Sequence, residues 1–291
     1  MSKPDETALE AWIDQCVAHL RDAEDFDVHR PHKDEFLLLY GVAVRVMRYS
    51  DAYLRLVRCG FVGEAVVLAR TALEHAVTLQ WVFIVNGGIN RFQVDVGHDR
   101  LEHYRNLAVW LDHHELAEAV ASLDSPPEGK RLPPFMNMLR ELDQEKFLET
   151  SYHILSQHVH VTHAAVAQFL EQGTEELHIK YEPKYGYQYQ ATYVVAVSCM
   201  LARWVVAMLT DDPPLLELLD KTSDDLILPM TLIDNVEEKK RRKGLSEAGA
   251  VKAILLATDV PAAVRLAPDH SLIGPNFHPF ATARARRGLS E

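Results

Sequence analysis

The sequence has little cysteine and glycine and no long uninterrupted apolar run. Its three cysteines, Cys16, Cys59 and Cys199, are odd in number and far apart in a chain of 291 residues, which favours free thiols over a disulfide framework. The N-terminus, MSKPDETALEAW, has no apolar signal region. No apolar run reaches the roughly 18 residues that span a bilayer. We therefore expect a cytoplasmic chain that is neither secreted nor inserted in a membrane.

The common signatures of cofactor chemistry are also absent. The sequence contains no glycine-rich phosphate loop, no Gly-x-Ser-x-Gly, no paired Cys-x2-Cys and no internal repeat, so neither a cofactor nor a resident metal is predicted. A formal net charge of −12 disfavours nonspecific binding of nucleic acid. A local basic patch can still bind phosphate, and the candidates are the basic run 239–243 and the tail arginines Arg284, Arg286 and Arg287.

What the sequence does contain is helical periodicity in a chain that is 48% hydrophobic. We predict an all-α fold, an antiparallel bundle of long helices. An N-terminal helix (1–30) precedes a bundle core (31–221) and a C-terminal helical extension with a loosely packed arm (222–291). Helices are predicted at 5–25, 33–58, 61–86, 90–123, 135–142, 146–171, 192–209 and 214–221, with an irregular loop or short hairpin near 172–190.

Charged residues interrupt the apolar stripe of the segment 61–85, around which we expect the fold to be organised. Arg70 and Glu74 lie on the same predicted helix face as Val66, Val77 and Trp81. Ionised side chains are almost never fully buried unless they are paired, and residues at i, i+4 can reach each other. The pair is therefore either a structural ion pair that sets the register of the helix or part of a functional site, which His75 would join.

A second polar stripe lies on the predicted helix 146–171. Tyr152, Ser156, His160 and His163 share a face there, and we expect that face to pack against Arg70 and Glu74. Each histidine on its own is readily explained as a hydrogen-bonded core residue, but several polar residues on one stripe favour a shared site. In the helix 33–58, Arg45 and Tyr49 lie on the predicted inward stripe Leu38, Val42, Arg45, Tyr49, Ala52 and Leu56. Arg45 either extends to solvent at the edge of this stripe or adds a ligand contact.

Two short motifs carry a family resemblance. LARTALE at 68–74 and YHILSQHVHVT at 152–162 together resemble the bacterial domain-of-unknown-function family 5677, over about residues 35–210. This resemblance implies a helical bundle with a polar site formed by Arg70, Glu74, Tyr152, Ser156 and His160. It implies no named reaction.

The spacing Arg70-x4-His75 is also similar to the signature of the HEPN superfamily of helical nucleases. That resemblance implies that the arginine and the histidine handle an RNA phosphate and its attacking 2′-hydroxyl, which needs a cation and a group that titrates near neutrality. The sequence departs from the HEPN pattern because the motif does not lie near the C-terminal end of the bundle. On this interpretation the chain is a ribonuclease or phosphate-ester enzyme of the toxin or phage-defence kind. Its partner would be RNA or a small phosphate-bearing ligand.

Two other interpretations stay open. Glu74, His160 and His163 would form a metal or small-ligand site if the two histidines at i, i+3 shared a metal. Alternatively, the polar core only sets the register of a noncatalytic scaffold. The sequence leaves open whether the protein is an enzyme and whether it forms a homo-oligomer.

Overall fold

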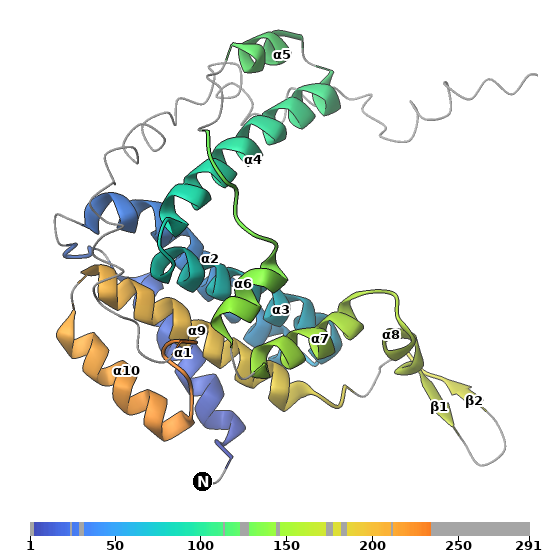
Figure 1. The fold of residues 1–291 in the computed structure, drawn as a ribbon. Helices are drawn as coiled ribbons and strands as arrows, with labels where there is room; N and C mark the ends of the chain where they lie inside the picture. The colour runs from blue at the N-terminus through green and yellow to red at the C-terminus, as the bar shows by residue number, and fades with distance from the viewer. Residues whose placement is uncertain are drawn as a thin grey trace, which may run out of the picture. The chain divides into compact units, whose positions relative to one another are not determined.

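The computed structural model describes residues 3–233 except 24, 29–31, 113, 123–127, 144–145, 173–176, 182–184 and 211. This part of the chain is all-α, as predicted, with ten helices and one antiparallel two-stranded hairpin (Figure 1). The elements are α1 (Glu6–Asp22), α2 (Lys33–Arg58), α3 (Val62–Ile84), α4 (Gly88–Leu111), α5 (His114–Ala121), α6 (Phe135–Leu142), α7 (Phe147–Val159), α8 (His163–Ala167), β1 (Leu170–Gln172), β2 (Leu177–Ile179), α9 (Gln188–Thr210) and α10 (Pro213–Leu226).

The contacts divide the chain into two compact units. The first unit contains the described residues within 3–95 and 128–233, and the second contains those within 96–122. In the second unit, Ala108 and Val120 form a small apolar cluster with Leu101, Tyr104 and Leu107. The predicted site residues, the core and the cavities discussed below belong to the first unit.

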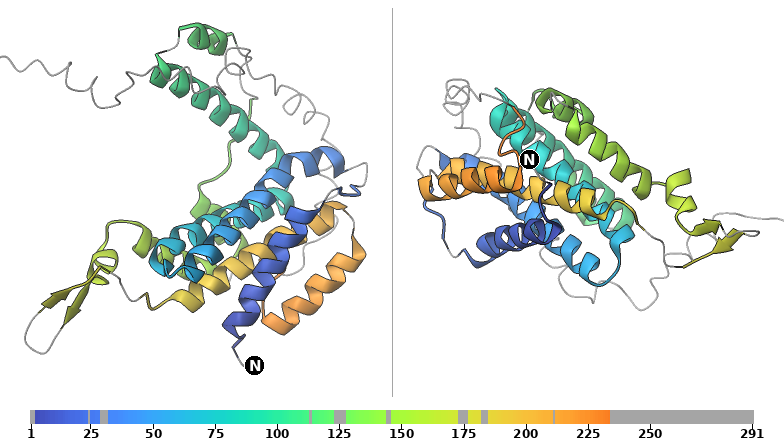
Figure 2. Two further views of the ribbon diagram at one scale, coloured as in Figure 1. Left: turned by 180° about the vertical axis from the view of Figure 1, so that it is seen from behind. Right: turned by 90° about the horizontal axis from the view of Figure 1, so that it is seen from below.

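α9 is the central helix of the first unit. It packs against α1, α2, α3, α7 and α10, as Figures 1 and 2 show, and its side chains are buried almost without interruption from Ala191 to Leu209. Within the described residues it is the one helix whose length and composition would allow it to cross a membrane, although 89% of its most apolar window is buried inside the fold. A helix that is apolar all round needs cover on every side, and here its neighbours supply that cover. The expectation that no segment is apolar enough for a span is therefore corrected for α9.

A tight turn between α2 and α3 makes the two helices pack along each other. Gly60 has a φ of +87°, which suits glycine because it lacks a Cβ. Its N–H donates to the Val57 carbonyl at 3.0 Å, and the N–H of Phe61 donates to the Leu56 carbonyl at 2.9 Å. This Schellman pattern satisfies the last carbonyls of α2 and ends the helix where the sequence predicts.

The buried face of α2 differs from the predicted stripe. Arg45 is exposed and Tyr49 is only half-buried. The residues that α2 buries are Glu35, Phe36, Leu39, Ala43, Val46, Met47, Ser50, Tyr53 and Leu54. The prediction was wrong by roughly one residue of rotation, because it placed the charged Arg45 inward, whereas the neighbouring face that carries Leu39, Val46 and Leu54 is the more apolar one.

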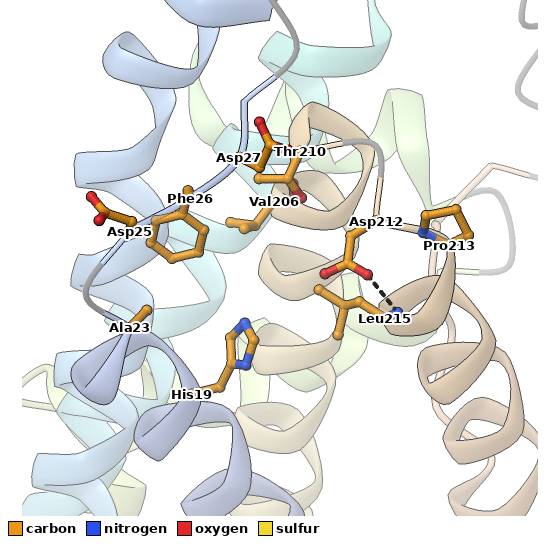
Figure 3. Close-up of a pocket in the computed structure, with 10 residues that line it drawn as sticks. All are labelled: His19, Ala23, Asp25, Phe26, Asp27, Val206, Thr210, Asp212, Pro213 and Leu215. Carbon is orange, nitrogen blue, oxygen red and sulfur yellow. Dashed lines mark hydrogen bonds between the residues drawn. The ribbon is translucent and has the colours of Figure 1, made fainter.

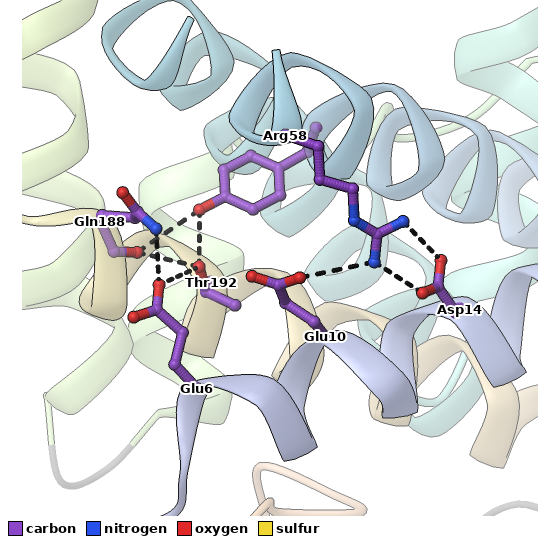
Figure 4. Close-up of polar contacts among 7 residues, drawn as sticks. Glu6, Glu10, Asp14, Arg58, Gln188 and Thr192 are labelled. Carbon is purple, nitrogen blue, oxygen red and sulfur yellow. Dashed lines mark hydrogen bonds and ion pairs between the residues drawn. The ribbon is translucent and has the colours of Figure 1, made fainter. Parts of the chain in front are cut away.

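Polar contacts fix α1 on the bundle (Figure 4). Arg58 at the end of α2 pairs with Asp14 at 2.7 Å and with Glu10 at 3.4 Å. Glu6 accepts hydrogen bonds from Gln188 at 2.9 Å and from Thr192 at 3.4 Å. Exposed pairs of this kind contribute about 0–1 kcal/mol each. The larger contribution to holding α1 therefore comes from its buried apolar face, which runs from Leu9 to Leu20.

Two long helices of the prediction are interrupted in the structure. The helix predicted at 90–123 ends at Leu111, and α5 starts at His114 after Asp112, whose φ is +51°. The helix predicted at 146–171 ends at Val159, because His160 is extended (φ −94°, ψ 163°). α8 and the β1–β2 hairpin then follow, so the hairpin begins two residues before the predicted 172–190 segment.

Other predicted bounds lie close to those observed. α6 spans Phe135–Leu142 as predicted, and α10 continues to Leu226 instead of ending at 221. The basic run 239–243, Arg284, Arg286 and Arg287 lie outside the described residues. The predicted division into 1–30, 31–221 and 222–291 therefore stays a prediction.

Candidate functional site

Arg70 and Glu74 face α7 from the middle of α3. They are one turn apart, and the Nη2 of Arg70 lies 3.1 Å from Oε1 of Glu74, with the two side chains 19% and 30% exposed. The flanking α3 residues Ala69, Ala72, Leu73 and Ala76 are fully buried. The ion pair thus lies at the border of the core, where its interaction is screened less than on the open surface.

Tyr152 of α7 joins this pair into one network. Its hydroxyl accepts from Nη2 of Arg70 at 2.7 Å and donates to Oε1 of Glu74 at 2.8 Å. Its ring packs against Phe135 of α6, with centroids 4.7 Å apart. Burial raises the pKa of the Tyr152 hydroxyl, the Arg70 hydrogen bond opposes this, and Glu74 adds to the increase. The phenol therefore stays protonated and acts as a donor to Glu74.

His160 completes the network at the end of α7. Its Nε2 lies 3.4 Å from Nη1 of Arg70, and the residue is exposed. A guanidinium only donates hydrogen bonds, so this geometry assigns Nε2 as the acceptor. The N–H of His160 donates to the Ser156 carbonyl at 3.2 Å. This last hydrogen bond of α7 holds His160 near Arg70 before the chain becomes extended. The predicted meeting of Arg70, Glu74, Tyr152 and His160 is therefore present.

Two buried polar atoms of Arg70 and of the α7 residue Ser156 have no hydrogen-bond partner among the described residues. They are the Nε of Arg70 and the Oγ of Ser156, which lies on α7 one turn after Tyr152 and one turn before His160. An unsatisfied buried polar group costs roughly 1–3 kcal/mol. Both atoms can donate to an oxygen, so the site offers donors that no described residue uses.

His75, Tyr49 and Arg45 form a separate group between α2 and α3. The Nδ1 of His75 donates to the Thr71 carbonyl at 2.9 Å, and its ring lies edge-on to Tyr49 with centroids 5.2 Å apart. Burial lowers the pKa of His75, the Thr71 hydrogen bond opposes this, and the charge of Arg45 lowers the pKa further. His75 follows Arg70 by five positions, so the two side chains contact different helices. Arg70 and His75 therefore do not converge as a nuclease pair would require.

His163 does not share a helix face with His160. It begins α8 and is exposed, whereas His160 lies in the extended segment that separates α7 from α8. Thr162 caps α8 by accepting from the Ala165 N–H at 3.2 Å. The proposed metal site needs two histidines at i, i+3 on one continuous helix, so its geometric basis is lost. Across the described ranges, no group of three or more His, Cys, Asp or Glu side chains is placed to hold a metal.

Phe135 belongs to the site although no sequence motif includes it. Phe135 is the first residue of α6, after Pro133 and Pro134, and its ring packs on Tyr152 and orients it. The two prolines predicted that α6 starts at this position. No sequence pattern indicated that the side chain of its first residue would contact α7. A contact of this kind depends on how α6 packs against α7.

A hollow of about 340 Å³ lies apart from the network, between the end of α1 and the start of α10 (Figure 3). Asp25, Asp27 and Asp212 make its lining acidic. Asp212 is already used as the N-cap of α10, because its carboxylate accepts from the Leu215 N–H at 3.0 Å. Burial and the charge of Arg203 lower the pKa of His19 at this hollow, and Asp212 partly opposes them.

Residues 36–177 match a family of unknown function (DUF5677). The match supports the resemblance that the two motifs indicated, but it ends at residue 177 and not near 210. The matched segment contains the whole Arg70 network. The match assigns no activity, and the HEPN resemblance gains no support from it. No curated protein and no solved structure matches the chain.

Proposed function

We propose that the network of Arg70, Glu74, Tyr152 and His160 binds a small ligand through a phosphate or carboxylate oxygen, in a cytoplasmic protein. The observation that carries this proposal is the pair of buried, unpartnered donors, Arg70 Nε and Ser156 Oγ. Charge-assisted hydrogen bonds from arginine to an oxyanion are roughly twice as strong as neutral ones. A ligand oxygen that reached either donor would satisfy a group that is otherwise buried without a partner.

The electrostatics of the network select the kind of ligand. Glu74 offsets part of the charge of Arg70 at 3.1 Å, so a ligand with a single compact anionic group fits better than a polyanion. Tyr152 stays protonated because burial raises its pKa, and its hydroxyl can therefore turn from Glu74 to a ligand oxygen. His160 lies at the exposed rim and can move aside without disturbing the core.

The test is calorimetric titration of the full chain with inorganic phosphate and with acetate at constant ionic strength. Ser156→Ala removes one unpartnered donor, and Arg70→Lys keeps the charge but removes the Nε–H. Each variant is expected to bind the preferred anion about tenfold more weakly, which corresponds to ~1.4 kcal/mol. His75→Ala is the matched control because His75 contacts α2, and it should bind like the wild type if it is folded.

Two results would reject this binding site. One is that neither anion binds the wild type. The other is that folded Ser156→Ala binds as tightly as the wild type. In either case the polar stripe is better explained as a scaffold that sets helix register.

Cleavage of a phosphate ester is the sharper form of this proposal. The titratable group would be His160, because it contacts Arg70 and His75 does not. Its test is the integrity of cellular RNA and the growth of cells that express wild type, Arg70→Ala or His160→Ala. Intact RNA and normal growth with the wild type would reject cleavage and leave ligand binding standing.

A further inference from the structure

An aromatic cavity lies at the other end of α7, away from the Arg70 network. Its volume is about 310 Å³, and its lining includes Phe147, Tyr189, Tyr193 and Ile227 together with Lys3 near the N-terminus. Phe147 is the first residue of α7 and is 50% exposed. The cavity is within the size range of sites that hold small molecules.

Three aromatic rings surround this cavity in different orientations. The rings of Tyr189 and Tyr193 are nearly parallel, at 23° with centroids 6.5 Å apart, and Phe147 stands at 89° to Tyr193 with centroids 5.8 Å apart. The Tyr189 hydroxyl donates to the Pro4 carbonyl at 3.1 Å, and the Tyr193 hydroxyl donates to the Ile227 carbonyl. Because backbone groups hold both hydroxyls, the faces of the rings are the surfaces that a ligand meets.

A cation of the chain itself already uses one of these faces. The Nζ of Lys3 lies 3.1 Å from the centroid of the Tyr189 ring, and Lys3 is exposed. Burial raises the pKa of Tyr189, and the nearby carboxylates of Glu6 and Asp5 add to this. Aromatic faces beside carboxylates attract a cation and disfavour an anion. Lys3 therefore shows which charge the cavity accepts.

Backbone strain is concentrated next to the same cavity. In the part of the chain that is described, three non-glycine residues have a positive φ, and two of them are Lys146 (57°), directly before Phe147, and Ile227 (54°), which lines the cavity. This conformation is a genuine outlier for a β-branched residue such as isoleucine. Ile227 is the C-cap of α10 and its N–H donates to the Ser223 carbonyl, so the end of a helix holds the chain in place at this wall of the cavity.

We propose that this cavity binds the alkylated ammonium group of a small molecule, in place of the ammonium of Lys3. A trimethylammonium group presents a diffuse charge and methyl groups that contact aromatic faces on several sides, whereas the strongly hydrated lysine ammonium contacts one ring and stays exposed. Asp5 and Glu6 follow Pro4 of the cavity lining in the chain and give this end of the site a negative charge. This site is independent of the proposed oxyanion site.

The test is calorimetric titration of the full chain with choline and with its neutral carbon isostere, 3,3-dimethylbutan-1-ol. Choline should bind at least about tenfold more tightly than the isostere, because only choline interacts with the ring quadrupoles as a cation. Lys3→Ala removes the internal competitor and should tighten choline binding. Phe147→Leu should weaken it, and Phe147→Trp should retain it.

Circular dichroism checks that each variant is folded, and the exposure of Lys3 and Phe147 makes all three substitutions mild. The proposal fails if choline binds neither the wild type nor Lys3→Ala. It also fails if choline and the neutral isostere bind equally, since the cavity would then be an apolar hollow without preference for a cation. Loss of choline binding in Phe147→Leu with full binding in Phe147→Trp is the supporting result.

Discussion

Replacing Glu74 by alanine tests how strongly the polar network contributes to stability. Glu74 accepts from Tyr152 at 2.8 Å and lies 3.1 Å from Arg70. Breaking a fully buried pair costs roughly 3–5 kcal/mol, but the two charged side chains are 30% and 19% exposed. Arg70 also keeps its contacts with Tyr152 and His160. We therefore expect Glu74→Ala to lower the free energy of unfolding by about 1–3 kcal/mol, the range for leaving a buried hydrogen-bonding group without its partner.

Urea unfolding followed by circular dichroism measures this loss. Glu64→Ala is the matched control, because Glu64 is an exposed carboxylate on the same helix, and a change there is expected to stay within about 0.5 kcal/mol. Glu74→Gln keeps an oxygen acceptor for Tyr152 and should lose less than Glu74→Ala. A double-mutant cycle with Tyr152→Phe should give a coupling energy of about 0.5–3 kcal/mol. If Glu74→Ala unfolds at the same urea concentration as Glu64→Ala, the network does not stabilise the packing of α3 on α7.

Three further predictions concern the stability of the fold: they involve Arg203, three partly buried histidines and Thr162. Arg203 is 1% exposed, and its Nε and Nη1 have no hydrogen-bond partner in the part of the chain that is described. Arg203→Met should therefore leave the free energy of unfolding, measured in urea, unchanged or raise it by roughly 1–3 kcal/mol; a loss of stability would contradict this. Burial lowers the pKa of His19, His75 and His158 in the folded protein. Below about pH 6.5 the unfolded chain therefore binds more protons than the folded protein, and the free energy of unfolding should decrease as the pH falls. His75→Gln removes one of these groups and should make that decrease less steep. Thr162→Ala removes the cap of α8 and should increase hydrogen exchange there, at a cost of about 0.5–2 kcal/mol, while α9 stays protected.

The sequence predicted the long helices well where local signals agree with packing. α6 begins directly after Pro133 and Pro134, and α2 ends at a glycine with positive φ, so both bounds follow from local chemistry. The meeting of α3 and α7 was predictable for a different reason. Each carries polar side chains on an apolar face, and such groups need partners when they are buried.

The interruption after α7 was missed because two signals compete there. The segment Val159 to Thr162 contains three β-branched residues, which disfavour a helix, and Thr162 is a good N-cap. The apolar pattern nevertheless resumes in residues 164–170 and imitates one continuous helix. Periodicity alone does not detect a short extended segment between two helical ones, and for this reason His163 was assigned to the wrong face.

Spacing along the chain also proved a poor guide to which histidine joins Arg70. His75 is five positions away on the same helix, yet it packs on Tyr49, whereas His160 is ninety positions away and contacts the guanidinium. A side chain at i+5 is rotated by about 140° from the first, because each residue of a helix adds about 100°. A short motif on one helix therefore predicts a shared site only when its spacing returns the second residue to the same face.

Ser156 is the residue of the site at which an effect on stability can be told apart from an effect on ligand binding. Arg70, Glu74 and Tyr152 bond to one another, so removing any of them weakens the packing of α3 on α7 whether or not a ligand binds, and loss of activity in such variants is ambiguous. Ser156 is different, because its buried hydroxyl has no hydrogen-bond partner within the described ranges, and burial lowers stability when a hydroxyl loses its hydrogen bonds to water. A scaffold that only sets register gains by replacing this serine with alanine, whereas a binding site loses a ligand contact. Stability and anion affinity should therefore change in opposite directions in Ser156→Ala if the site binds a ligand.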